Sequence, residues 1–374
     1  MLRPRWLLRR GRSVMRLLQR ILLGGLGALL VACPALAQSR AMSSPAALAA
    51  LVNSPAPAAS KKNAGVDRLQ IDLAHKALID GDYAKAKALA EPLAKRNDPA
   101  AHHLLGYLYE KGLGVRADIG AALSHYGDAA IGGNVDAQLA LGVLAFEGDG
   151  VYPDYERAAG WFRLAAAQGD PRADVRMGLL YAEGLGVAQS SVAAAHHFAK
   201  AAGKGDAEGQ FWLGLSWLNG DGLPQSYRKA ATNFEAAALQ GHGEAAYHLA
   251  LIHDSPVLGA PDEKKAASYM RMAAASGFPP AFAAMGLMVH RGDADGLAAD
   301  WFEKGARAGD PQSAFLYAVA LFEGDGRAKD IVGALTIADQ LIAAAATPDP
   351  LKAQAAALKK TIRARTPGPL TLRN

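Results

Sequence analysis

Paired histidines are the residues whose type and spacing could most readily do chemistry in this sequence. They occur as His102-His103 and His196-His197, and imidazoles are common ligands of transition metals. Adjacent residues point about 100° apart on a helix, so each pair offers at most one ligand to a given site. No cysteine or spaced carboxylate completes a four-ligand set. The sequence therefore predicts packing or surface histidines and no metal site.

Acidic residues beside short glycine turns are the second candidate. Glu147, Glu183 and Glu323 each precede a Gly-x-Gly element, where paired carboxylates could act as general acid and base and glycines could cradle a phosphate. A dinucleotide fingerprint needs a preceding strand, and no phosphate loop, nucleophile elbow or zinc-protease helix is present. These residues are therefore expected to end helices. We predict a protein that is not an enzyme and has no cofactor and no catalytic residues.

Glycines instead mark a structural period. Two independent series of small residues advance in steps of 36 residues, with one step of 32 at the same unit of both series. Glycine inside a helix is intrinsically costly, so its recurrence implies a close approach of two helices. The Gly-x-Gly turns require positive φ. The first series lies inside the first helix of each unit: Gly106, Gly142, Gly178, Gly214, Ala250, Gly286 and Ala318. The second series ends the second helix of each unit: Gly133, Gly169, Gly205, Gly241, Gly277 and Gly309.

The repeating pattern carries a family resemblance. Ala-x-x-x-Leu-Gly-x-x-Tyr-x-x-Gly-x-Gly-Val, followed by Ala-x-x-Trp-Phe-x-x-Ala-Ala-x-x-Gly, resembles the Sel1-like repeat, a relative of the tetratricopeptide repeat. The resemblance covers residues 98–343 as seven units and implies an all-α, right-handed α-solenoid of helical hairpins. Unit five lacks the Gly-x-Gly turn and unit six has a shortened one. A capping hairpin (66–97) and a capping helix with a tail (344–374) are expected at the two ends, with Asp349 as the N-cap of that helix.

The resemblance also implies a function, the binding of a protein or peptide along the concave face of the solenoid. Positions −3, +1 and +4 relative to the mid-helix small residue share one face of the first helix of each unit. We select thirteen residues at these positions and call them the groove face. A rival interpretation is that tight curvature buries them against neighbouring units. The groove face comprises His103, Tyr107, Glu110, Leu139, Val143, Phe146, Phe211, Leu215, Leu218, Tyr247, Leu251, Phe315 and Phe322.

The N-terminal region predicts export. Residues 1–37 hold seven arginines and no acid. Within this segment the arginines precede a short apolar run and then Ala35-Leu36-Ala37, an order that is typical of a signal peptide cut after Ala37. Met15 is an alternative start. Without this segment the charge is 40 − 7 = 33 basic against 35 acidic residues, which gives no support to nucleic-acid binding. Residues 38–65, rich in Ser, Pro and Ala, predict a disordered linker.

Three alternatives stay open for location and function. The predicted protein is a monomeric periplasmic adaptor for envelope assembly or signalling. Cys33 lies in a sequence that resembles a lipobox, which makes an outer-membrane lipoprotein scaffold for secretion or polysaccharide export the first rival. Relatives linked to β-lactam binding make an envelope hydrolase the second, although we find no Ser-x-x-Lys set for it.

Overall fold

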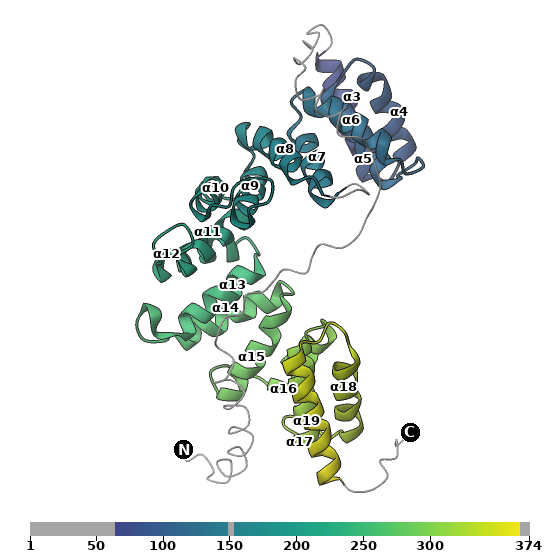
Figure 1. Cartoon of the computed structure of the whole chain (residues 1–374). Coiled ribbons are helices and arrows are strands. Elements are labelled where there is room, and N and C mark those ends of the chain that lie inside the picture. Colours follow the sequence, from purple (N-terminus) through teal and green to yellow (C-terminus); the bar gives the residue numbers. More distant parts are fainter. Residues whose placement is uncertain (1–63, 149–152, 367–374) are drawn as a thin grey trace. The chain divides into compact units, whose positions relative to one another are not determined.

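The computed structural model describes residues 64–148 and 153–366, and its regular elements in those ranges are all helices (Figure 1). The predicted signal peptide, Cys33, nearly all of the predicted linker and the end of the C-terminal tail lie outside the described residues. Among the described helices, none is both long and apolar enough to cross a bilayer. The sequence prediction of an all-α fold is confirmed.

Seven helical hairpins follow one another along the chain (Figure 1). Each first helix packs on the second helix of its own repeat, and each second helix packs on the first helix of the next repeat. The first helices are α5 (Pro99–Lys111), α7 (Val135–Glu147), α9 (Pro171–Glu183), α11 (Ala207–Asn219), α13 (Gly243–Asp254), α15 (Pro279–Arg291) and α17 (Pro311–Glu323). The second helices are α6 (Ile119–Ile131), α8 (Tyr155–Ala167), α10 (Ser191–Gly203), α12 (Tyr227–Ala238), α14 (Glu263–Ala275), α16 (Ala298–Arg307) and α18 (Ile331–Ala343).

The mid-helix glycines are required because an aromatic ring of the second helix lies directly against them. A Cβ atom on Gly142 would lie 2.4 Å from Cε1 of Phe162, and one on Gly178 would lie 2.4 Å from Cε1 of Phe198. Real Cβ contacts are not this short, so only glycine fits beside the ring. The fifth and seventh repeats carry alanine at this position, and there the second helix has a methionine or an alanine in place of the ring. Small and large residues therefore vary together across each hairpin.

Helix ends account for the other recurring residues. The turn glycines Gly112 and Gly114 have φ of 65° and 67°, and Gly112 ends α5 in the left-handed conformation. Gly133, which follows α6, has φ of 84°. These values confirm the prediction of positive φ. The fifth repeat replaces the Gly-x-Gly turn with a short 3-10 helix, η2 (Pro256–Leu258).

N-caps follow the same period as the glycines. The Asp98 carboxylate accepts a hydrogen bond of 2.9 Å from the Ala101 amide, and Asp206 accepts one of 2.7 Å from Gly209. Such a cap stabilises a helix by about 1 kcal/mol, and prolines such as Pro99 in the first turn add a preset φ.

Helices at both ends of the array complete the fold, with two corrections to the sequence prediction. The N-terminal hairpin is α3 (Ala64–Ile79) and α4 (Tyr83–Ala94), and the C-terminal helix is α19 (Asp349–Arg365). Leu69, Leu73, Ala77 and Leu78 recur at helical spacing, which predicts one apolar face for α3. That prediction is wrong in part, because Leu69 and Leu73 are exposed while Ile71 and Ala74 are buried against α4 and α5. Helix α19 begins one residue earlier than expected, with Pro348 as N-cap and Asp349 as its first residue.

Candidate protein-interaction face

The thirteen residues of the groove face divide into three groups by exposure. Tyr107 and Leu251 are exposed, with 37% and 41% of their surface accessible. Three phenylalanines are buried. The remaining eight are half-buried: His103, Glu110, Leu139, Val143, Phe146, Leu215, Leu218 and Tyr247. The face is therefore not one continuous open groove, and accessibility differs from repeat to repeat.

The buried phenylalanines correct the sequence prediction for their positions. Phe211 is 2% exposed because the first turn of the next repeat covers it, with its ring centroid 4.5 Å from that of His242. Phe322 is 8% exposed because α19 packs over it beside Ile362. Phe315 is 5% exposed. These three side chains belong to the core, as the rival interpretation expected, and offer little surface to a partner.

The half-buried apolar residues pack against core clusters that extend from their own repeat into the next one. Leu139, Val143 and Phe146 of α7 pack against a cluster that contains Met177 and Leu180 of α9. Each of these side chains is thus packed on the core on one side and accessible to solvent on the other. Residues held in this way have fixed positions before any partner arrives.

Two polar residues of the groove face support the first repeat. The buried hydroxyl of Tyr126 donates a hydrogen bond of 2.7 Å to the Glu110 carboxylate. Burial, followed by this hydrogen bond, raises the pKa of Tyr126 far above its usual range. Burial lowers the pKa of His103, whose ring lies beside that of Tyr126 with 5.7 Å between centroids. Glu110 therefore satisfies a buried donor.

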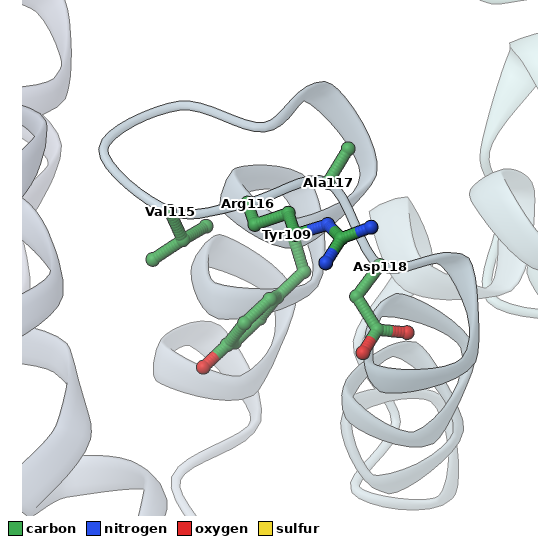
Figure 2. Close-up of a pocket in the computed structure, with 5 residues that line it drawn as sticks. All are labelled: Tyr109, Val115, Arg116, Ala117 and Asp118. Atoms are coloured by element: carbon green, nitrogen blue, oxygen red, sulfur yellow. The ribbon is translucent and has the colours of Figure 1, made fainter.

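A hollow lies at the turn of the first repeat (Figure 2). Tyr109 reaches it from α5, while Val115, Arg116 and Ala117 come from the loop before α6. Asp118 completes the lining, but its carboxylate accepts a hydrogen bond from the Ala121 amide and caps α6. The lining holds no nucleophile beside a general base, so this hollow has no arrangement for acyl transfer.

One Ser-x-x-Lys tetrapeptide is present, Ser226-Tyr-Arg-Lys229, which corrects the absence inferred from the sequence. The Ser226 hydroxyl is the N-cap of α12 and accepts a hydrogen bond of 3.4 Å from the Lys229 amide. The Lys229 ammonium lies over the Trp217 ring, 4.0 Å from its centroid. Both side chains thus have contacts that stabilise the helix start and the hairpin, a different arrangement from a serine activated by a lysine.

Three further histidines pack on aromatic rings. Burial lowers the pKa of His248 to about 4, and its ring stacks on Phe234 with 5.4 Å between centroids. His253 stacks on Tyr269 with 5.6 Å between centroids. His197 stacks on Tyr181 in the same manner.

Two polar clusters between first and second helices were missed by the sequence reasoning. Asp174 of α9 is fully buried, and its carboxylate lies 2.9 Å from Nδ1 of His197 and 3.0 Å from Nζ of Lys200. At the equivalent place in the first repeat, His102 of α5 lies beside two residues of α6, His125 and Asp128. In both clusters the first-helix residue and the histidine of the second helix are 23 residues apart in the sequence. This spacing could have revealed the clusters, whereas a search for neighbouring histidines does not.

Stacked hairpins with a periodic small-to-large packing pair and capping helices at both ends define an α-helical repeat protein of the solenoid class. The Sel1 repeat matches this chain at residues 99–134, 135–170, 171–206, 207–242, 243–278, 284–310 and 311–335. The chain belongs to the Sel1 repeat family.

The chain is also similar to several solved structures. A Sel1 repeat protein from Oxalobacter formigenes is 26% identical, with a TM-score of 0.58 over 63% of this chain and 96% of that one. A protective antigen of uropathogenic Escherichia coli with an SLR fold is 22% identical, with a TM-score of 0.43 over 83% and 90%. An immunity protein from Pseudomonas aeruginosa is 21% identical, with a TM-score of 0.38 over 59% and 84%. No curated protein matches the chain.

Proposed function

We propose that this protein is a non-catalytic adaptor that binds a protein or peptide partner through the accessible part of the groove face. The Sel1-repeat solenoid is commonly a scaffold for protein interactions. The observation that carries the proposal is the placement of Tyr107 and Leu251, two large side chains that stay exposed on a face whose other residues are buried or half-buried. Aromatic and large apolar groups at such positions are typical contact residues of interfaces.

The half-buried residues of the groove face support the same function. Phe146 packs against the core cluster that contains Met177 and Leu180 and against the Tyr155 ring, whose centroid lies 5.2 Å away in an edge-on arrangement. Tyr247 is held by Phe278, with 5.3 Å between ring centroids. Ordering a free side chain on binding costs about 0.5–1.5 kcal/mol, and side chains already fixed by neighbours avoid most of that loss. A partner peptide would therefore meet a rigid surface.

Site-specific photo-crosslinking tests the binding face. A photoreactive amino acid at Leu251 is expected to give discrete adducts in cells that express the protein. The matched control is Leu239, an exposed leucine at the end of α12, outside the groove face. Adducts should be at least several-fold more abundant at Leu251, because the contact is local to the first-helix face. Equal yields at the two positions, or none at Leu251, would contradict the proposal.

We further propose that the adaptor acts in the periplasm after cleavage behind Ala37. The support is the sequence of residues 1–37, with its arginine-rich start, apolar run and small residues before Gln38. Mass spectrometry of the mature protein is expected to find an N-terminus at Gln38. An acylated Cys33 would instead support the lipoprotein scaffold, and an intact residue 1 or 15 would overturn export by cleavage.

A further inference from the structure

Two imidazoles and a carboxylate meet between the helices of the first repeat. His102 comes from α5, and His125 and Asp128 lie one turn apart on α6. Nδ1 of His102 lies 3.0 Å from Nδ1 of His125 and 3.5 Å from Oδ2 of Asp128. The three candidate ligand atoms all lie within 4.8 Å of one another. The cluster therefore converges on a single point.

These separations fit a small divalent cation. With metal–nitrogen bonds of about 2.0–2.1 Å and tetrahedral angles, two ligand atoms are about 3.3 Å apart. The observed 3.0 Å and 3.5 Å lie on either side of that value. Two histidines and one carboxylate form a ligand set used for zinc and iron, with at least one coordination position left for water.

The burial of the three residues and the packing of His125 suit such an ion. His102 is 7% exposed, His125 is half-buried and Asp128 is exposed, so the cluster runs from the core to solvent and an ion has a way in. The Tyr109 ring stacks on His125, with 5.6 Å between centroids, and fixes the orientation of the imidazole.

The third repeat shows what replaces a metal at the same place. Its residues, Asp174, His197 and Lys200, have the same spacings of 23 and 26. There the ammonium of Lys200 lies against the buried carboxylate and supplies the positive charge internally. In the first repeat the last position is Asp128, whose ion-pair contact within the described ranges is His102. An external cation would take the place that a lysine fills two repeats later.

We propose that His102, His125 and Asp128 bind a divalent transition-metal ion of the zinc and cobalt class, which joins α5 to α6. The inference does not depend on the proposed partner function. A bound ion would fasten the first hairpin of the array with ligands from both helices.

Metal titration of the full chain tests the proposal. Chelator-treated protein is titrated with Zn²⁺ by calorimetry and with Co²⁺ by visible absorption, which reports tetrahedral coordination. One saturable site is expected. Asp128→Asn and His125→Gln should each weaken binding by more than the roughly 10- to 100-fold that loss of an outer-shell contact produces. Asp128 is exposed, so Asp128→Asn should keep the native circular dichroism spectrum.

Two histidine variants serve as controls. His197→Gln removes the equivalent histidine of the third repeat, and His196→Gln removes an exposed one beside it. Both should bind Zn²⁺ as the unchanged protein does. The proposal fails if neither metal saturates a site, if Asp128→Asn and His125→Gln leave the affinity unchanged, or if His197→Gln lowers it as much as they do.

Discussion

Gly178→Ala is expected to destabilise the array by about 1–3 kcal/mol, the usual range for overpacking a core. Its new Cβ would lie 2.4 Å from the Phe198 ring, which is 3% exposed and cannot move aside freely. At an open helical position the same change stabilises by roughly 0.5–1 kcal/mol, since alanine is the better helix former. Gly160→Ala in α8 is the matched control, because its Cβ would meet nothing within 4 Å. Urea unfolding followed by circular dichroism measures both.

A second substitution should rescue the first. The fifth repeat carries Ala250 and Met270 where the third carries Gly178 and Phe198. Methionine is flexible and adapts to a narrowed space. Gly178→Ala combined with Phe198→Met should therefore be less destabilised than the sum of the two single variants, by about 0.5–3 kcal/mol in a double-mutant cycle. Strict additivity, or a neutral Gly178→Ala, would show that helix approach does not impose this glycine.

The fold was predictable because the constraints that impose it are local and repeated. A glycine under a ring, a glycine with positive φ after a helix and a step of 36 residues each arise from one hairpin, and stacking copies them. The N-caps at Asp98 and Asp206 carried the same period and could have set the helix starts directly. Burial of α3 was harder to predict, because a terminal helix has a neighbour on one side only.

The candidate sites were harder to predict, because their residues come from two helices and the pattern of one helix does not show which residues face each other. His102 was first considered with His103, its neighbour in sequence, but its partner in space is His125 on the opposite helix. Which second-helix residue faces it depends on the register of the hairpin. The repeat offers a way to find that register, since Asp174 and His197 have the same separation of 23 residues.

Exposure along the groove face could not be predicted for a related reason. The positions −3, +1 and +4 define a face of one helix, whereas accessibility depends on the helix that follows. Phe322 would be open at the end of the array, but α19 takes the place of a further repeat and covers it. Leu251, at the same face of the fifth repeat, remains accessible. Whether a residue of the groove face is accessible or buried therefore differs from repeat to repeat.

Phe211→Ala is expected to destabilise the protein by about 3–5 kcal/mol, as truncation of a buried phenylalanine does. Its ring packs on Phe234 and His242, so the change leaves a cavity between the fourth and fifth repeats. Leu251→Ala is the control on the same face, and an exposed side chain should cost within about 0.5 kcal/mol. Chemical unfolding of the two variants measures the difference.

The difference in stability between Phe211→Ala and Leu251→Ala also shows which of the two side chains is accessible to a partner. A large loss for Phe211→Ala and none for Leu251→Ala would mean that binding defects are informative at Leu251 and Tyr107, while at Phe211 they only report unfolding. The opposite order of stabilities would mean that the repeats are spread apart in solution and that the phenylalanine is accessible to a partner. Because stacked repeats contact only their neighbours, such spreading should lower stability first at the junction between the fourth and fifth repeats, where α12 packs on α13. Hydrogen exchange of those two helices would detect it before global unfolding.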